Sequence, residues 1–181
     1  MLDQPDLTKS IAEKLKSKGH TVSVSESSTG GLISAALLSV AGASAYFKGG
    51  SVIYTLASRK IFLGLSKDDI EGLKPMTEMM ALKFAEKTRK VLDSDWAIAE
   101  LGIAGPTGSP YGVGPGNSVV AISGPKNSSI KIETGESNRE NNMQAFTKQA
   151  LQLLDETLTK RQLPPTPAKT GQFIRSEPTC Y

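Results

Sequence analysis

The sequence is poor in cysteine and histidine, and these shortages exclude several kinds of site. Its 181 residues include one cysteine, Cys180, and one histidine, His20. A single cysteine forms no internal disulfide bond and no cysteine-rich zinc site. A single histidine excludes a mechanism that needs two histidine ligands and argues against a Ser–His–Asp triad. We expect neither a metal site nor a cofactor.

Long apolar runs and a strong net charge are also missing. No stretch approaches the roughly 18 apolar residues of a membrane span, and the first residues lack the apolar core of a signal peptide. Lys and Arg total 21 against 18 Asp and Glu, so the net charge is +3. That charge is too small to indicate nucleic-acid binding through bulk electrostatics. We therefore expect a cytoplasmic protein with no membrane and no nucleic-acid partner.

What the sequence contains is the alternation of helical and strand patterns that is typical of an α/β protein. Apolar residues make up 38% of the chain and charged residues 22%, an ordinary balance for one globular domain. This alternation predicts a single-domain, layered α/β/α sandwich with a mostly parallel sheet. The predicted helices cover residues 7–18, 32–40, 57–63, 79–92 and 143–158, and the predicted strands cover residues 21–25, 51–54, 96–103, 118–122 and 130–132.

The predicted domain occupies residues 1–160, and a segment of different composition follows it. Residues 161–181 contain four of the ten prolines and show almost no periodicity. Proline interrupts helices and sheets, so we expect this stretch to be a flexible tail or an arm that packs on a neighbouring chain.

The loop between the first predicted strand and the helix after it is rich in hydroxyl groups and glycine. It contains Ser27, Ser28 and Thr29, followed by Gly30 and Gly31. Free backbone N–H groups and the helix dipole at such a position favour a phosphate or a developing oxyanion, and a serine there can act as a nucleophile. The alternative is structural: Ser28 or Thr29 caps the helix and the glycines allow a tight turn.

A second glycine-rich loop follows the predicted strand at residues 96–103. Its first part includes Gly102, Ala104 and Gly105, whose small size lets a ligand or another backbone approach closely. Loops at the carboxyl ends of parallel strands build ligand sites, so both loops are expected on one rim of the sheet. The alternative is a wide surface loop without a ligand.

Four other residues are candidates for supporting chemistry. Tyr54, Arg59 and Lys60 follow the second predicted strand, and Arg139 begins the last helix. A tyrosine with a cation can assist a serine, and a lysine suits the role of base in a chain with one histidine. The alternative places Tyr54 in the core and the charged groups in solvent. Arg139 either grips a phosphate or is a solvated charge.

Four segments of the chain form a series in unbroken order over roughly residues 7–158. They are Glu26-Ser27-Ser28-Thr29-Gly30-Gly31, residues 40–47 with Gly49-Gly50, Tyr54 followed ten residues later by Gly64, and Gly102-Ile103-Ala104-Gly105-Pro106. Taken together, the chain resembles the CinA C-terminal domain family. The resemblance implies a C–N hydrolase that converts nicotinamide mononucleotide to nicotinate mononucleotide and ammonia.

The resemblance also implies roles for individual residues. Ser27 attacks the carboxamide carbon, with Tyr54 and Lys60 as its catalytic partners. Backbone N–H groups near Thr29 to Gly31, or those of the loop at residues 102–106, stabilise the oxyanion. The Ser27 hydroxyl is accordingly expected to face an open hollow between these loops. The implied partners are a small-molecule nucleotide and further copies of the chain in a homo-oligomer. The implied substrate-binding residues are Glu26, Ser28, Thr29, Gly30, Gly31, Arg59, Gly102, Ala104, Gly105 and Arg139.

Three positions depart from the pattern that the resemblance brings with it. Arg59 stands where a lysine is usual, and arginine does not act as a general base. Leu101 replaces a hydroxyl residue and is expected at the rim of the pocket. Met143 stands where a second arginine belongs. These departures favour an alternative in which the chain is a catalytically degenerate nucleotide-binding or interaction module with the same fold.

Overall fold

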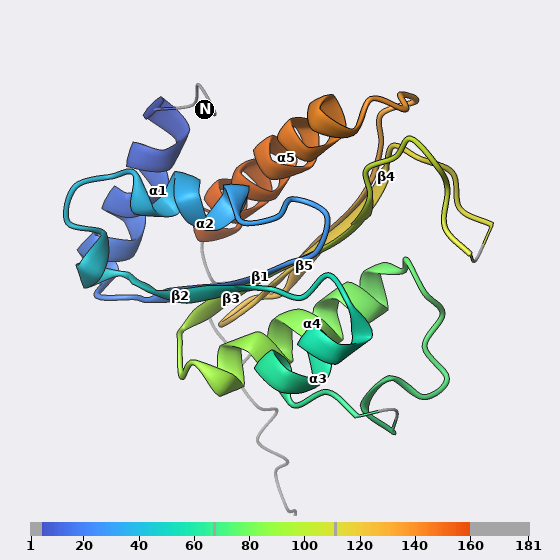
Figure 1. The fold of residues 1–181 in the computed structure, drawn as a ribbon. Helices are drawn as coiled ribbons and strands as arrows, with labels where there is room; N and C mark the ends of the chain where they lie inside the picture. The colour runs from blue at the N-terminus through green and yellow to red at the C-terminus, as the bar shows by residue number, and fades with distance from the viewer. Residues whose placement is uncertain (1–4, 67, 111, 160–181) are drawn as a thin grey trace, which may run out of the picture.

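A sheet of five strands separates two layers of helices in the computed structural model, which describes residues 5–66, 68–110 and 112–159 (Figure 1). In chain order the elements are α1 (Pro5–Lys18), β1 (Val22–Glu26), α2 (Leu32–Leu38), the 3-10 turn η1 (Ala43–Ala45), β2 (Phe47–Val52), α3 (Leu56–Leu63), the 3-10 turn η2 (Asp68–Ile70), α4 (Glu78–Val91), β3 (Trp96–Ile103), β4 (Asn117–Ser123), β5 (Ser128–Glu133) and α5 (Arg139–Thr159).

The strands are arranged in the order β2-β1-β3-β4-β5. β1 pairs in parallel with both β2 and β3, whereas β4 is antiparallel to β3 and to β5. Among the five strands that the structure describes, β4 therefore runs opposite to the other four. The prediction of a mostly parallel sheet is confirmed, and the carboxyl ends of β1, β2 and β3 meet at one edge.

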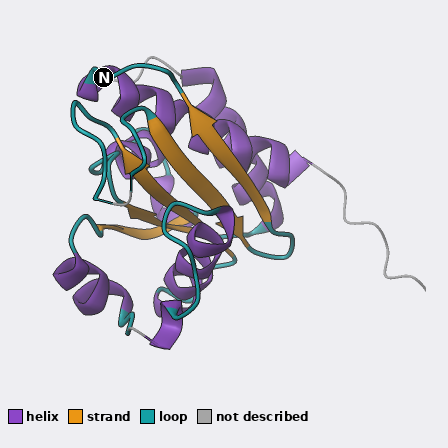
Figure 2. Cartoon of the chain, turned by 90° about the vertical axis from the view of Figure 1, so that its right-hand side faces the viewer, coloured by secondary structure: helices purple, strands orange, loops and turns teal. Residues whose placement is uncertain are grey.

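The two faces of the sheet are covered by different helices. α1, α2 and α5 pack on one face, and α3 and α4 pack on the other (Figure 1; Figure 2 shows the helices flanking the strands in a second view). Side chains alternate along each strand, so one strand serves both cores. On β3, Trp96 and Ile98 belong to the core beneath α5, while Ala99 and Leu101 belong to the core beneath α4. The predicted α/β/α layering is confirmed.

The second strand is the element whose position differs most from the prediction. It covers Phe47–Val52 rather than residues 51–54. Gly49 and Gly50 argue locally for a break, but both pair with β1, opposite Ser23 and Val24. Pairing with a central strand overrides the weak strand preference of glycine. As a result, Tyr54 lies beyond the strand, in the connection to α3.

Two further expectations concern the ends of the chain and the membrane. The proline-rich tail predicted for residues 161–181 lies outside the described residues. No helix within the described ranges is both long enough and apolar enough to cross a bilayer.

Candidate active site

The loops that follow β1, β2 and β3 begin side by side at the carboxyl edge of the sheet. The N–H of Ser27 donates to the carbonyl of Glu100 at 3.1 Å, and the N–H of Ile53 donates to the carbonyl of Glu26 at 2.7 Å. These bonds extend the strand pairing by one step into the loops. The two glycine-rich loops therefore lie on one rim, as the sequence predicts.

The Glu26 carboxylate at the end of β1 caps the start of α2. Its Oε2 accepts the N–H groups of Gly31 and Ile33 at 3.0 and 2.9 Å, and its Oε1 accepts the N–H and hydroxyl of Ser34 at 2.9 and 2.6 Å. A helix N-terminus carries unpaired N–H groups and partial positive charge, which favour a carboxylate. The alternative in which Ser28 or Thr29 caps the helix is therefore wrong.

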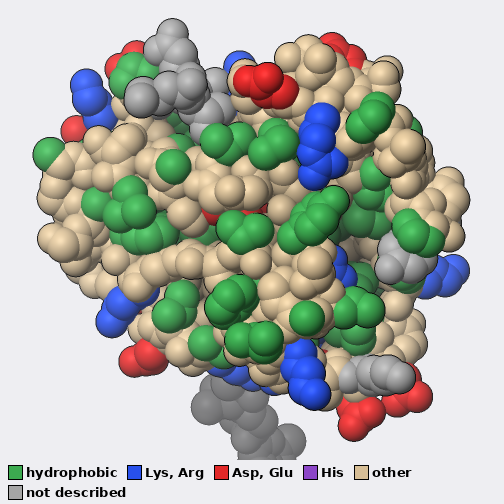
Figure 3. All heavy atoms as spheres, viewed as in Figure 1, with side chains coloured by type: hydrophobic (Ala, Val, Ile, Leu, Met, Phe, Trp, Pro, Cys, Tyr) green, Lys and Arg blue, Asp and Glu red, His purple; other side chains and the backbone are tan. Residues whose placement is uncertain are grey.

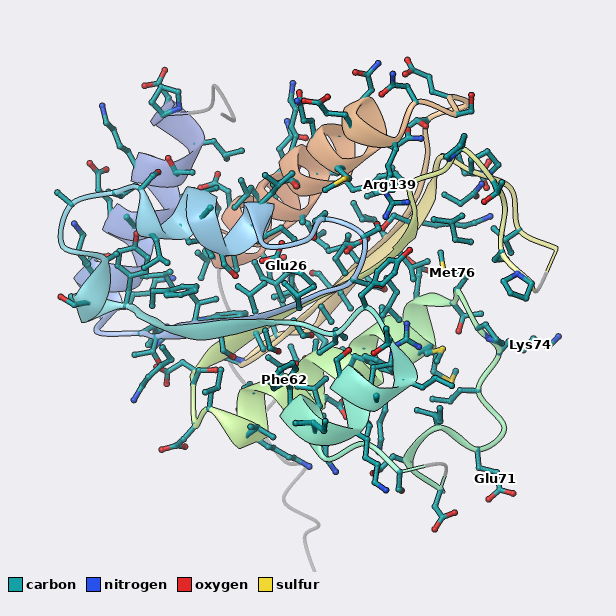
Figure 4. All side chains as sticks on the ribbon, viewed as in Figure 1. Glu26, Phe62, Glu71, Lys74, Met76 and Arg139 are labelled. Carbon is teal, nitrogen blue, oxygen red and sulfur yellow. The ribbon has the colours of Figure 1, made fainter. Side chains whose placement is uncertain are left out.

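These contacts also bear on the expectation that Glu26 binds a substrate. The side chain is completely buried, and Oε2 accepts a further bond from the Thr29 hydroxyl at 2.8 Å. Five donors thus use both oxygens of Glu26. The observed contacts place this residue in the scaffold beneath the loop (Figure 4 labels it between α2 and the sheet).

Glu100, near the end of β3, is a second buried carboxyl group under the same loop. Its Oε2 accepts the N–H groups of Ser27 and Thr29 at 3.0 and 3.1 Å and lies 3.1 Å from the Thr29 hydroxyl. Its Oε1 accepts the Ser28 hydroxyl at 2.7 Å and lies 3.1 Å from the Ser118 hydroxyl. Burial raises the pKa of Glu100 above its ordinary value, against the opposing effect of these hydrogen bonds.

The two carboxyl groups share a backbone register. Glu26 and Glu100 are direct partners across the parallel pair β1–β3, and both are fully buried. The salt bridges of the described residues join other pairs, so no lysine or arginine in those ranges neutralises either group. Burial of two carboxyl groups without a counter-ion is costly unless hydrogen bonds or protonation compensate.

The two carboxyl groups determine which backbone N–H groups of the loop remain free. The N–H groups of Ser27, Thr29 and Gly31 are used. In the part of the chain that the structure describes, the N–H groups of Ser28 and Gly30 have no hydrogen-bond partner. Of the N–H groups expected to stabilise an oxyanion, Thr29 to Gly31, that of Gly30 is therefore the one available to an anion. The N–H of Ser28, which was not in that prediction, is available as well.

Ser27 itself is less open than the sequence predicts. The residue is 5% exposed. Its hydroxyl has no hydrogen-bond partner within the described residues. Among those residues, Arg89 Nε is the side-chain polar atom that is both fully buried and without a partner, so the Ser27 oxygen is not fully buried. The Ser27 oxygen therefore keeps a small contact with solvent, at the base of the loop rather than in a wide hollow.

Glycine is required at two kinds of position in this site. Gly30 and Gly31 have φ values of 64° and 105°, in the left-handed region that side chains disfavour. Gly102 is needed for space, because a Cβ there would overlap Ser28 Oγ and Glu100 Oε1 and would lie 3.1 Å from Phe146 Cδ2. Gly102 thus leaves room for the carboxyl group under the first loop.

A second cluster joins α5 to the other two loops. Arg139 Nη1 donates to the carbonyl of Gly105 at 2.9 Å, and Nη2 lies 3.5 Å from the Tyr54 hydroxyl. The guanidinium carbon is 5.9 Å from the centre of the Tyr54 ring. Nearby, buried Asn142 donates to the carbonyl of Ala104 at 2.8 Å. Tyr54 is 54% exposed, so the alternative that places it in the core is wrong.

The two cations after β2 are placed differently from each other. Arg59 Nε donates to the carbonyl of Ile53 at 3.1 Å, and its guanidinium lies 5.4 Å from the centre of the Phe84 ring. Lys60, one position further along α3, is exposed. Because the Ser27 hydroxyl has no partner in the described ranges, no lysine there lies within hydrogen-bond distance of it.

Comparison with known proteins identifies the family of this chain. The family model described as "CinA C-terminal domain" matches residues 4–158. The chain belongs to the CinA C-terminal domain family.

Relatives of known sequence agree with this assignment. The chain is 34% identical to a CinA-like protein from Fervidobacterium nodosum over 124 residues, which are 68% of this chain and 30% of that protein. It is 36% identical to a CinA-like protein from Prochlorococcus marinus over 123 residues, 68% of this chain and 29% of that protein. The matched region is thus about a third of these relatives.

Solved structures of the family share the fold. The competence/damage inducible protein CihA from Agrobacterium tumefaciens is 28% identical, with a TM-score of 0.78 over 86% of this chain and 95% of that one. The competence damage-inducible protein A from Klebsiella pneumoniae is 24% identical, with a TM-score of 0.80 over 87% of this chain and 98% of that one. The second likeness concerns the fold alone.

Two departures from the CinA pattern occupy unlike places in the structure. Leu101 is buried beneath α4 among apolar side chains, so the expectation that it lines the pocket rim is wrong. Its neighbour Glu100 takes the site face because side chains alternate along a strand. Met143 lies against the first loop instead, since its Cε would be 3.4 Å from a Cβ placed on Gly30.

The sequence analysis did not predict three residues of the candidate site: Glu100, Ser118 and Asn142. All three are fully buried and polar. Glu100 offered a signal, because a charged residue inside the apolar stretch of Trp96–Ile103 is unusual and marks a paired or functional group. Ser118 and Asn142 offered none, since serine and asparagine are ordinary at a strand start and in a first helical turn.

Proposed function

We propose that this CinA domain hydrolyses the carboxamide of nicotinamide mononucleotide or of a closely related nucleotide amide. One observation carries the proposal beyond family membership. Within the described residues, the Ser27 hydroxyl after β1 has no hydrogen-bond partner, and neither do the N–H groups of Ser28 and Gly30 in the same loop. A nucleophile followed directly by an oxyanion donor is the arrangement that acyl transfer needs.

The proposed reaction has two stages. The Ser27 Oγ attacks the carboxamide carbon, and the negative charge that develops on the carbonyl oxygen is held by the N–H groups of Ser28 and Gly30. Collapse of this intermediate breaks the C–N bond: the nitrogen receives the proton that the Ser27 hydroxyl gave up and leaves as ammonia, so that an acyl ester remains on Ser27. Water then attacks the ester, which frees nicotinate mononucleotide and restores the hydroxyl. Tyr54 and Lys60 are the proposed proton carriers.

The nucleotide phosphate is proposed to bind at Arg139. Its guanidinium spans Gly105 and Tyr54, on the rim that also carries Ser27. A guanidinium presents donors in a fork that matches phosphate oxygens. Replacement of Arg139 by Ala removes a charged hydrogen bond of about 1.5–3 kcal/mol, so the KM for the mononucleotide should rise at least tenfold.

Ammonia release from nicotinamide mononucleotide tests the activity directly. The variant Ser27→Ala should lose activity by on the order of 10⁴-fold or more and keep its melting temperature, because the hydroxyl has no partner in the described residues. The exposed Ser44→Ala is the matched control. Release that continues unchanged in Ser27→Ala would rule out the serine mechanism.

A second candidate function is a nucleotide-binding module without turnover. Arg59 is engaged with the Ile53 carbonyl and the Phe84 ring, and Lys60 stands in solvent, so neither supplies a base at Ser27 in this structure. A thermal-shift measurement separates the candidates, since a ligand that binds the folded state raises the melting temperature whether or not product forms. A shift without ammonia release favours the module.

A further inference from the structure

The buried pair Glu26 and Glu100 poses a question about protons. The two carboxyl groups are register partners on adjacent strands, are fully buried, and have no cationic partner among the described residues. Two like charges placed side by side in a low-dielectric interior repel strongly. At least one of the two groups is therefore best held in its neutral form.

The donors around Glu26 suit the ionised form. Five donors reach its two oxygens: the hydroxyls of Thr29 and Ser34, and the N–H groups of Gly31, Ile33 and Ser34. Three of these are backbone N–H groups, which only donate, and they belong to the N-terminus of α2, where a negative charge is stabilised. A proton on either oxygen of Glu26 would point toward these N–H groups and would have no acceptor among them.

The surroundings of Glu100 suit the neutral acid. Ser118 Oγ lies 3.1 Å from Oε1 and 3.3 Å from the carbonyl of Leu101. The Ser118 hydroxyl is thus able to accept a hydrogen bond from a protonated Oε1 and to donate its own hydrogen to the carbonyl of Leu101. Oε2 then acts as a carbonyl oxygen that accepts the N–H groups of Ser27 and Thr29.

The Thr29 hydroxyl lies between the two carboxyl groups and donates its hydrogen to one of them. Its hydroxyl carries one hydrogen and lies 2.8 Å from Glu26 Oε2 and 3.1 Å from Glu100 Oε2. One hydrogen fully satisfies one acceptor, and the shorter distance assigns it to Glu26. With Glu100 neutral, every donor in the network has an acceptor, and one negative charge remains.

We propose that Glu100 is a positioning residue that acts as a neutral carboxylic acid, holding the N–H groups of Ser27 and Thr29 so that those of Ser28 and Gly30 stay free beside the Ser27 hydroxyl. The charge of the pair resides on Glu26. The effect on catalysis rests on the proposed function, whereas the assignment of the proton does not. The elements that face Glu100 contribute Glu26 from β1, Ser118 from β4 and the apolar Phe146 from α5. Arg139 bonds instead to Gly105 and Tyr54.

The sign of the pH dependence follows from the neutral form. Burial raises the pKa of Glu100 in the folded protein, so the stability of the neutral form is fully present below the ordinary glutamate value of about 4.3. It is lost progressively as the pH rises above that value and through the raised folded value. Glu100→Gln imitates the neutral acid and does not titrate, so its melting temperature should gain on the wild type as the pH rises.

The test compares melting temperatures of Glu100→Gln, Glu26→Gln and the exposed control Glu13→Gln across pH. We expect Glu100→Gln to stay within about 3 °C of the wild type at acidic pH, and Glu26→Gln to fall by roughly 5–10 °C because its amide N–H₂ meets backbone donors. Equal losses in the two buried variants, or no pH-dependent gain of Glu100→Gln, would overturn the assignment.

Infrared spectroscopy keeps the proposal testable if Glu26→Gln does not fold. The carbonyl stretch of a neutral carboxylic acid should be present in the wild type at neutral pH and absent in Glu100→Gln. A wild-type spectrum without this band overturns the proposal. Ammonia release tests the positioning role: the kcat of the wild type should fall as the pH rises through the raised pKa of Glu100, and that part of the fall should be absent in Glu100→Gln. If no variant releases ammonia, the proposed function fails while the melting and infrared results still decide the proton.

Discussion

The loop after β1 and the segment after β2 leave the same edge of the sheet, but they are held in opposite ways. In the loop after β1, two buried carboxyl groups bind alternate backbone N–H groups, and Ser28 and Thr29 are themselves buried. In the segment after β2, Tyr54 and Lys60 are exposed. The core therefore holds the candidate nucleophile in place, whereas it does not hold the proposed proton carriers.

The comparison leads to predictions that are ordered by their expected effect on the free energy of unfolding. Gly102→Ala should have the largest effect, because the added Cβ overlaps Ser28 Oγ and Glu100 Oε1 beneath the first loop. Overpacking of this kind lowers the free energy of unfolding by about 1–3 kcal/mol. Urea denaturation measures the change.

Gly114→Ala is the control for this prediction. A Cβ at Gly114 meets no atom within 4 Å, and its φ lies outside the left-handed region. This variant should match the wild type or be more stable by up to about 1 kcal/mol. If both glycine variants behave alike, the first loop is not held by the tight packing described above.

The segment after β2 continues into an apolar surface, for which we predict a role in self-association. Ile61 and Phe62 of α3 are 74% and 51% exposed, and hydrophobic side chains gather over the lower part of the face in Figure 3, where α3 lies. A contiguous exposed apolar patch is typical of a protein–protein interface, whereas single exposed apolar side chains are ordinary. The double variant Ile61→Ser, Phe62→Ser should have a lower molar mass in solution than the wild type, because its subunits separate. The free energy of unfolding of its monomer should change by about 0.5 kcal/mol or less.

Light scattering after size-exclusion chromatography measures that mass. Val91→Ser, which replaces another exposed apolar side chain at the end of α4, is the matched control and should leave the mass unchanged. A wild-type chain that elutes as a monomer contradicts the prediction, and the patch is then ordinary surface.

Lys60→Met should have the smallest effect on stability. Because Lys60 is exposed on α3, the unfolding free energy should change by less than about 0.5 kcal/mol. Under the proposed function, the same variant loses a proton carrier, so ammonia release should fall by about 10²-fold or more. The exposed Lys48→Met serves as the control. Unchanged release in Lys60→Met would remove Lys60 from the mechanism and leave Tyr54.

Much of the fold followed from the sequence because its signals are local. Helical spacing and apolar runs predicted the five α-helices and the five strands of the described residues but not the two 3-10 turns, and the bounds predicted for Trp96–Ile103 match the structure. The one displaced strand, β2, contains two glycines whose pairing partner lies elsewhere in the chain. Local preference is weak there, and the neighbouring strand decides.

The same contrast between local signals and strand pairing applies to the residues of the candidate site. Ser27, Gly30 and Gly31 stood out because hydroxyl and glycine residues between a strand and a helix have a direct physical meaning. The structural role of Glu26 and the whole of Glu100 depended on which strands are neighbours. The prediction for Leu101 was wrong because successive side chains of a strand point to opposite faces of the sheet. Leu101 therefore faces the core beneath α4, and its neighbour Glu100 faces the site.

Patterns within the amino-acid sequence were enough to predict the layered α/β fold, the two glycine-rich loops on one rim and membership of the CinA C-terminal domain family. Strand pairing in the folded chain was needed to show that two glutamates are direct partners and share the N–H groups and hydroxyls of one loop. A strand's own sequence sets which side chains lie on each face, but the register with the neighbouring strand sets which side chains of the two strands come into contact. Only that meeting shows which N–H groups of the loop are free for a ligand.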